Sequence, residues 1–488
     1  MSFFLATVPA GTQLYHGTSK PEPIQGLEWL AFEPEHAMIF ARPHGPPPGD
    51  DKDRPPREDK VAESQSSHHG PGHPPSRPKG PEQDANGYLH TYAPKHDIRL
   101  LYIDGLSAGK TSNGTLDTQD MLLLNSSTLD PHGPMGGEHE RAYGMCNMTS
   151  TLWEGKIDGI LRMEGGFEII LCDFAKHLER TDAITVTQHQ YWTGEKGFLG
   201  GWSYIKAVTR RYHGIGGDRV QLDLNNFVSV FSYSDLGGLF TNDVHSDYAM
   251  PRLQNVKEAD RIHVKDDVTE MILRKDWDKE TAAKDWQAVA DNVVARYAKP
   301  LHYLHTNKEV RGDKKALEFY LINLLHPFID YTARNATVET QRCVAQVIPP
   351  LPTPPSTAAS LAHRTVHAVT HHICDTLLTA LSIASASTSH ASFTQVYAEL
   401  ATDLIDKLVD YLNWTTWKEC GTCADEEICY IPIWPMGNNE DHASPKCMDE
   451  ENARDRWGYW GVGRMGPPPP GNGHNGEVRH GRRGKKHD

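Results

Sequence analysis

A long segment without the means to fold by itself interrupts the first part of this chain. Residues 43–87 are dominated by proline, glycine, histidine and charged side chains. Such a composition buries too little apolar surface to offset the entropy lost on folding, so this segment is predicted to be a disordered insertion. Two strand-like runs rich in aliphatic and aromatic residues follow at 88–92 and 98–103. The flanking segments are therefore predicted to form one domain over residues 1–180.

Three short motifs precede the insertion. They are Tyr15-His16-Gly17-Thr18, then Gly26-Leu27-Glu28-Trp29-Leu30-Ala31-Phe32, then Ala37-Met38-Ile39-Phe40-Ala41. A fourth motif follows it, with Ile157-Asp158-Gly159-Ile160-Leu161 leading to Gly165-Gly166-Phe167-Glu168-Ile169-Ile170-Leu171. This order resembles the ADP-ribosyltransferase fold, in which a strand ending in His-Gly-Ser/Thr precedes a Gly-x-x-aromatic-x-Ala strand, a helix with another aromatic residue and a late strand beginning with Glu. The resemblance implies an α+β fold with a split β-sheet.

The resemblance also implies a site that holds NAD as substrate. In the family the His binds a ribose hydroxyl, the backbone of the next Gly binds the carboxamide, and aromatic rings pack on the nicotinamide. His16, Gly17 and Thr18 are the corresponding binding residues here, with Trp29 and Phe40 at the aromatic positions. The family usually has Tyr at both aromatic positions. Trp and Phe keep the stacking face but remove the hydroxyl.

The resemblance places the catalytic acid at Glu168, with His16 as its partner. Breaking the bond between nicotinamide and ribose passes through an oxocarbenium-like transition state, which a carboxylate stabilises. The expected reaction is ADP-ribosyl transfer or NAD hydrolysis. No motif identifies the acceptor. The alternative is a non-catalytic secreted or interaction protein that retains the fold, because a Glu at the start of an Ile-Ile-Leu strand is common.

A second alternative is nucleotide binding by Gly105-Leu106-Ser107-Ala108-Gly109-Lys110-Thr111, which follows an apolar run. A phosphate-binding loop needs a Gly six positions before its Lys, and that position is Asp104. The residues that follow also lack the apolar period of a helix. This segment is therefore interpreted as a loop after a strand, in which Lys110 can still meet a pyrophosphate or substrate.

The remainder of the chain is divided by changes in composition. Residues 181–275 form an unassigned α/β segment, and residues 276–412 are predicted to be a helical domain with a Pro-rich linker at 349–355. Two apolar stripes at helical spacing are predicted to face its core. They consist of Trp286, Val289, Val293 and Tyr297, and of Val396, Leu400, Leu404, Leu408 and Leu412, which Ile405 and Val409 widen. The tail, 451–488, is predicted to be disordered and basic at its end.

Two features of the C-terminal half could hold a metal. His363, His367, His371 and Asp375 recur every four residues, but an apolar stripe beside them favours a boundary between core and solvent. No metal site is assigned to them. Residues 413–450 are predicted to form a Cys-rich module whose four cysteines make two disulfides or bind zinc with His442. These cysteines are Cys420, Cys423, Cys429 and Cys447.

Composition argues against some classes of partner but does not decide in which cellular compartment the protein resides. The net charge of −15 argues against general nucleic-acid binding, and no apolar run is long enough for a membrane span. Five Asn-x-Ser/Thr sequons and eight cysteines favour secretion, whereas an N-terminus without a clear signal peptide favours the cytoplasm. The sequons are Asn113, Asn125, Asn147, Asn335 and Asn413. The chain is also similar to uncharacterised proteins of filamentous fungi.

Overall fold

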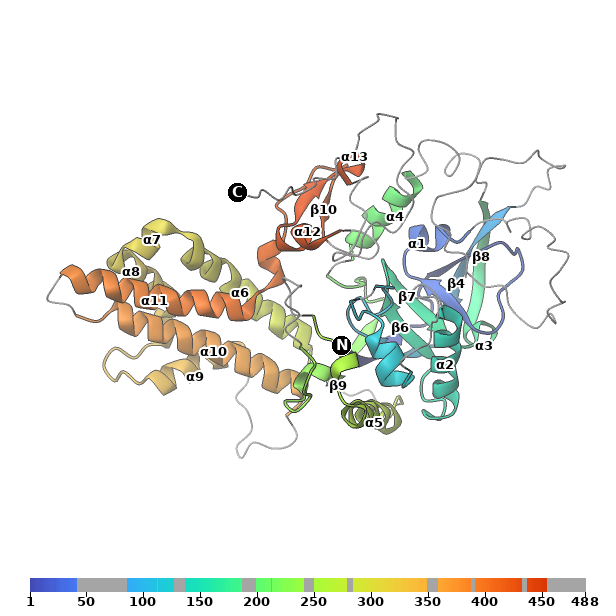
Figure 1. The fold of residues 1–488 in the computed structure, drawn as a ribbon, viewed down its shortest axis with the longest axis horizontal. Helices are drawn as coiled ribbons and strands as arrows, with labels where there is room; N and C mark the ends of the chain where they lie inside the picture. The colour runs from blue at the N-terminus through green and yellow to red at the C-terminus, as the bar shows by residue number, and fades with distance from the viewer. Residues whose placement is uncertain are drawn as a thin grey trace, which may run out of the picture.

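The computed structural model describes residues 1–41, 86–111, 113–126, 137–186, 199–211, 213–240, 250–278, 284–348, 359–387, 391–431 and 437–453. A large sheet with flanking helices forms the N-terminal part, and a bundle of long helices projects from it (Figure 1). The α+β prediction is therefore confirmed, with a mainly helical C-terminal region. The predicted insertion up to residue 85, the linker and the tail from residue 454 lie outside the described residues.

One nine-stranded sheet organises the N-terminal part, in the order β8-β4-β2-β3-β7-β6-β5-β1-β9. Its strands are β1 (Ser2–Val8), β2 (Leu14–Thr18), β3 (Glu28–Ala31), β4 (Gly87–Pro94), β5 (Ile98–Ile103), β6 (Gly159–Met163), β7 (Phe167–Leu171), β8 (Leu178–Val186) and β9 (Gln221–Ser229). Neighbours are antiparallel except β5 and β6. The boundary at residue 180 falls inside β8, and β9 of the 181–275 segment completes the opposite edge.

The central strands are apolar on both sides because both faces of the sheet are covered. On one face, Ile160 and Ile170 pack with α2 (Glu138–Ser150), α5 (Glu258–Arg274) and the π-helical turn η1 (Thr118–Leu123). On the other face, a second core includes Leu30, Ile169 and Leu171. The short helix α3 (Phe174–His177) contributes to this second core through Phe174. A disulfide between Cys146 and Cys172 links α2 to the end of β7.

The Cys-rich module packs against α4 (Leu199–Thr209) through a small apolar core (Figure 1). It contains β10 (Ile428–Tyr430), α12 (Asn439–Ala443), β11 (Lys446–Met448) and α13 (Glu450–Ala453). Of the two arrangements predicted for its cysteines, the structure has the disulfides, which pair Cys420 with Cys429 and Cys423 with Cys447. Sulfurs of Cys420, Cys423 and Cys447 nevertheless lie within 4.8 Å of one another.

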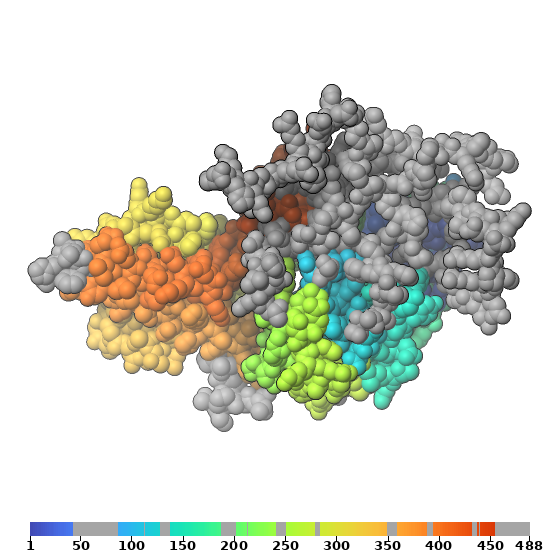
Figure 2. Space-filling model, in the orientation of Figure 1, coloured from blue at the N-terminus to red at the C-terminus, as the bar shows by residue number. Residues whose placement is uncertain are grey.

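Helices of five to 24 residues form the bundle that extends away from the sheet (Figure 2). They are α6 (Trp286–Thr306), α7 (Lys308–Gly312), α8 (Lys314–Leu325), α9 (Ala336–Ala345), α10 (Leu361–Ala384) and α11 (Ala391–Leu412). Strand β9 joins the bundle to the sheet, because Leu224 and Phe227 pack against the helical core. The indole of Trp286 also donates a hydrogen bond to Asn225 Oδ1 at 3.0 Å.

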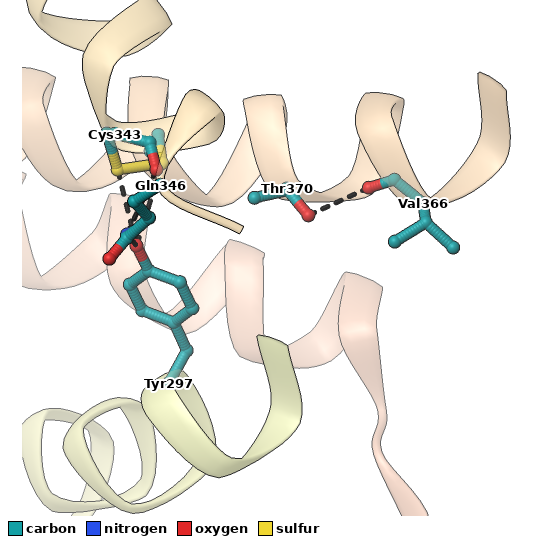
Figure 3. Close-up of a disulfide and its surroundings, with 6 residues drawn as sticks. Tyr297, Cys343, Gln346, Val366 and Thr370 are labelled. Carbon is teal, nitrogen blue, oxygen red and sulfur yellow. Dashed lines mark hydrogen bonds between the residues drawn. A yellow bond between two sulfur atoms is a disulfide. The ribbon is translucent and has the colours of Figure 1, made fainter. Parts of the chain in front are cut away.

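A disulfide between Cys343 of α9 and Cys374 of α10 lies inside this helical core. The side chain of Tyr297 on α6 points at it, as Figure 3 shows, with its hydroxyl 3.3 Å from the Cys343 sulfur. Gln346 donates to the same hydroxyl at 2.9 Å. Three helices are therefore joined at one buried point.

The predicted stripe on α6 is buried, as expected, whereas the stripe predicted on α11 is buried only from its middle onward. Its first two positions, Val396 and Leu400, are 46% and 49% exposed. The later positions Ile405, Leu408 and Val409 are buried as predicted. Four residues span more than one turn of 3.6, so a strict four-residue repeat drifts around the helix.

The histidine row of α10 drifts in the same way, from His363, stacked on Trp286, to an exposed His371 and Asp375. Among the described residues, no three His or carboxylate groups of this row converge on one point. None of the described helices is long and apolar enough to cross a membrane, which agrees with the expectation of no span.

Removing the Cys343–Cys374 disulfide tests its part in the bundle. Its 31-residue separation predicts that replacing both cysteines with Ala lowers the unfolding free energy of the helical core. By loop-closure entropy the loss is about 3.5 kcal/mol. Hydrogen exchange of α9 and α10 amides measures it. The control removes the Cys420–Cys429 disulfide, which should leave those amides unchanged; equal loss of protection in both variants would contradict a local role.

Candidate functional site

Five of the six residues predicted from the motifs line one cavity between β2, β3, β7 and α1 (Pro34–Met38). They are His16, Gly17, Trp29, Phe40 and Glu168. The sixth, Thr18, does not line it, and its hydroxyl accepts a hydrogen bond from the Lys20 amide at 3.2 Å. The cavity volume is about 10 Å³, room for about one water molecule. A ligand with an aromatic ring therefore requires this cavity to open.

The cavity exists because two neighbouring strands diverge. Strands β2 and β3 share one paired position, Tyr15 with Ala31. The next residue, His16, donates its Nδ1–H to the backbone carbonyl of Trp29 at 2.7 Å. Its ring also packs edge-on against Phe174. Burial lowers the pKa of His16 to about 4, so at neutral pH the ring is neutral. Because Nδ1 carries the proton, Nε2 is the hydrogen-bond acceptor.

Helix α1 closes the cavity, and two glycines allow it to approach. A Cβ atom on Gly17 would lie 2.0 Å from the carbonyl oxygen of Ala37. One on Gly166 would lie 2.7 Å from Nδ1 of His36. Burial lowers the pKa of His36 to about 4, and its Nδ1 has no hydrogen-bond partner within the described part of the chain. Both glycines are thus fixed by the packing of α1.

Glu168 is held by a buried arginine on the adjacent strand. The register aligns Glu168 with Arg162 of β6 and Ala31 of β3, so their side chains share one face of the sheet. Oε1 of Glu168 accepts from Nε of Arg162 at 2.8 Å. The Arg162 Nη1 donates to Gln119 Oε1 at 2.8 Å, and Nη2 also contacts Glu138. Every nitrogen of this guanidinium is occupied.

The arginine belongs to a larger buried ion network. Lys110, which is 1% exposed, pairs with Glu164 at 2.7 Å. Arg141 of α2 pairs with Asp120 of η1 at 2.7 Å. Glu138 lies 3.8 Å from both Lys110 and Arg141. The members are thus the cations Lys110, Arg141 and Arg162 with the carboxylates of Asp120, Glu138, Glu164 and Glu168.

This network sets the proton affinities of its carboxyl groups. Burial raises the pKa of Glu168 to about 7, with Glu164 adding to the rise and Arg162 opposing it. Burial also acts on Glu138, but Arg162 and Lys110 outweigh it and lower that pKa to about 2. Among the residues that the structure describes, three cations face four carboxylates, so the fully ionised cluster carries one more negative than positive charge. A proton on Glu168 removes it.

Sequence reasoning missed most of the residues around Glu168. The sequence indicates Lys110 only as a contact for phosphate, whereas in the structure it is buried and paired with Glu164. Arg162 had a readable signal, because it is a charged residue at an inward position of an otherwise apolar strand, paired in register with Glu168. Glu138, Arg141 and His36 lie on helices and gave no such signal.

Comparisons with known proteins found one family model and two yeast relatives. Residues 1–194 match the family model described as the YPL277C N-terminal domain. The uncharacterised protein YOR389W of Saccharomyces cerevisiae is 25% identical over 90% of this chain and 79% of its own length. The uncharacterised yeast protein YPL277C is 32% identical over 40% of each chain. No solved structure matches. The chain is therefore similar to uncharacterised fungal proteins.

The titration of Glu168 is directly measurable. Difference infrared spectroscopy should show a protonated carboxyl band that disappears as pH rises through about 7 and is absent in Glu168→Gln. Because this pKa lies above that of an unfolded Glu, folding stability should fall as pH rises from about 4.5 to about 7. Replacing Arg162 with Gln removes a cation and should move the midpoint higher. The control Arg211→Gln acts on Glu33 instead; a Glu168 midpoint near 4 would contradict the network.

Proposed function

We propose that this protein cleaves the bond between nicotinamide and ribose of NAD, as an ADP-ribosyltransferase or NAD glycohydrolase. The observation that supports the proposal best is the meeting of His16, Trp29 and Glu168 at one cavity. These residues come from three motifs as much as 152 positions apart in the chain, taking 168 minus 16. An active site requires these side chains to meet at one place. A non-catalytic protein that retains the fold does not require it.

Each proposed role follows from the local chemistry. Ionised Glu168 stabilises the positive charge that develops on the ribose as nicotinamide leaves, and its low-dielectric surroundings strengthen that interaction. Arg162 orients the carboxylate. The free Nε2 of His16 accepts a hydrogen bond from a ribose hydroxyl. Trp29 and Phe40 supply apolar faces for the nicotinamide ring.

Opening of the site is part of the proposal. The cavity of about 10 Å³ is far smaller than the 300–1,000 Å³ typical of ligand sites. Helix α1 is the element to move, because it is only five residues long and contacts Gly17 through Ala37. Displacing α1 would expose Phe40 and the buried Nδ1 of His36, which has no hydrogen-bond partner among the described residues, to the substrate.

Nucleotide binding by the loop with Lys110 is a weaker proposal. The Lys110 ammonium is buried and paired with Glu164 at 2.7 Å. A phosphate at this Lys would have to replace that carboxylate and leave Glu164 buried without its cation, at a cost of several kcal/mol.

Release of nicotinamide from NAD by the purified chain tests the enzyme proposal. Glu168→Gln should reduce the rate by about 10²–10³-fold because it removes the charge that stabilises the transition state. Activity of the wild type should rise with pH through about 7, as Glu168 ionises. Glu179→Gln is the control, since Glu179 is exposed on β8 of the same sheet. Absence of release together with absence of NAD binding by calorimetry would favour the non-catalytic alternative.

We also propose that the chain folds in the secretory pathway. All eight cysteines are paired in four disulfides, which persist in oxidising compartments. Four of the five sequon asparagines are exposed, namely Asn125, Asn147, Asn335 and Asn413. The fifth, Asn113, is half-buried. Oxidised cysteines and accessible acceptors on both the sheet domain and the bundle support the same compartment.

Glycan removal tests this compartment. Protein isolated from a fungal host should lose mass on treatment with an N-glycosidase, and the quadruple Asn→Gln variant of the exposed sequons should show almost no shift. Asn113→Gln alone is the matched control and should keep the shift of the wild type. An unglycosylated chain with free thiols would contradict secretion.

A further inference from the structure

We propose that the Cys-rich module is a thiol–disulfide exchange site, in which a small thiol makes the Cys420–Cys429 and Cys423–Cys447 disulfides change partners. The site is a cavity of about 310 Å³ between this module and the end of α4. Cys423 and Cys429, one cysteine from each disulfide, line its wall. The exchange is independent of NAD chemistry at the first cavity.

Sulfur atoms of the two disulfides lie close to one another. Sγ of Cys420 is within 4.8 Å of the sulfurs of Cys423 and Cys447, which form the other disulfide. Exchange requires a thiolate to reach a disulfide sulfur, so its rate depends on this access. All four cysteines of the module are half-buried, whereas both cysteines of the bundle disulfide are 0% exposed. The module is therefore the place where disulfides can meet both each other and solvent.

A second complete pairing is available to the same four cysteines. Cys420 and Cys423 are separated by two residues, which is the spacing of the Cys-x-x-Cys disulfide in redox proteins. Cys429 on β10 lies directly opposite Cys447 on β11 in the antiparallel register. Opposed residues have Cα atoms about 4.5–5.5 Å apart, within the range of about 4.4–6.8 Å that disulfides span. The hairpin can thus accept a Cys429–Cys447 bond without a change of register.

The change of partners takes three exchanges. A small thiol loses its proton, attacks Sγ of Cys429 to form a mixed disulfide, and releases Cys420 as a thiolate. Cys420 attacks Sγ of Cys423, which forms the Cys420–Cys423 bond and releases Cys447. The Cys447 thiolate attacks Cys429 across the hairpin and expels the small thiol, which regains its proton. Two disulfides exist before and after, so no oxidant or reductant is consumed.

The side chains that line the cavity carry balanced charge. Lys206 and Arg210, at the end of α4 and just after it, face Asp425 and Glu427 of the module. Lys206 also donates to the backbone carbonyl of Asp425 at 2.6 Å. Because neither sign of charge is in excess, the cavity favours a small neutral thiol over one that carries several charges.

The observed pairing connects the exit of the bundle to α4. Each disulfide ties the Cys-x-x-Cys segment to one strand of the hairpin, β10 or β11. The hairpin packs on α4 through Ile428, Tyr430 and Met448. Tyr204 of α4 in turn packs against the His36 ring of α1, with 5.3 Å between ring centroids. After the exchange, only backbone joins the segment to the hairpin, so the packing of α4 should loosen.

Mass mapping after treatment with a trace of 2-mercaptoethanol tests the proposal on the full chain. Cleavage after Glu427 and Glu440 places the two cysteines of the Cys-x-x-Cys segment, the cysteine of β10 and that of β11 on three separate peptides. The observed pairing links all three peptides. The exchanged pairing should give one peptide with an internal disulfide and a second product in which the other two peptides are linked.

Two variants test the route. Thr209→Trp fills the cavity without altering a cysteine and should slow the exchange about tenfold by restricting access. Thr365→Trp is the matched control, because Thr365 is exposed on α10 and makes the same hydrogen bond to its own helix. Cys420→Ser leaves Cys429 without its partner. Cys429 should then bond Cys447, so that the free thiol is found on Cys423 without any added thiol.

Four results would overturn the proposal. One is persistence of the observed pairing at a thiol concentration that opens the half-buried Cys146–Cys172 disulfide. Another is reduction to free thiols with no new pairs. A third is an unchanged exchange rate in Thr209→Trp, with circular dichroism showing that it folds. The fourth is a free thiol that stays on Cys429 in Cys420→Ser. Faster hydrogen exchange of α4 amides in the exchanged form would support the link to α4, and unchanged amides would overturn that link.

Discussion

The buried guanidinium of Arg162 is the interaction on which the rest of the N-terminal domain depends. It contacts Glu168 of the neighbouring strand, Glu138 of α2 and Gln119 of η1, and it is 1% exposed. Taking such a charge out of water costs several kcal/mol, and only closely placed carboxylates compensate for it. The helices that supply those partners are therefore fixed on this face of the sheet. A sheet face with an arginine at its centre has few alternative ways to pack.

The same burial that makes the network costly also gives Glu168 its chemical character. A carboxylate in water would be ionised at all physiological pH values. Burial raises the pKa of Glu168 to about 7, and the neighbouring carboxylates of Glu164 and Glu138 add to this rise. Arg162 both fixes its position and limits the rise of its pKa. The network thus supplies order and a carboxyl group whose charge changes near pH 7, and a surface ion pair would supply neither.

Local patterns predicted the elements, and long-range contacts escaped prediction. The motifs around His16, Trp29 and Glu168 fall on β2, β3 and β7, and the spacing of Trp286 to Tyr297 gives a buried helix face. The place of β9 beside β1 depends on pairing over more than two hundred residues, which no local pattern encodes. Disulfide partners are likewise not set by cysteine spacing. The charged side chains around Arg162 belong to separate helices and strands, so their proximity is visible only in the folded chain.

Two arginines at opposite ends of the β5–β6 pair show how burial decides the role of one residue type. Arg162 donates through all of its nitrogens to protein acceptors and is 1% exposed, so it has nothing left to offer a ligand and acts as a positioning residue. Arg99 is held by Asp158 with similar geometry, yet it is 32% exposed and keeps Nη1 free. The carboxylate thus orients both groups. A guanidinium whose nitrogens all donate inside the protein holds its partners in place, whereas a partly exposed one still contacts solvent.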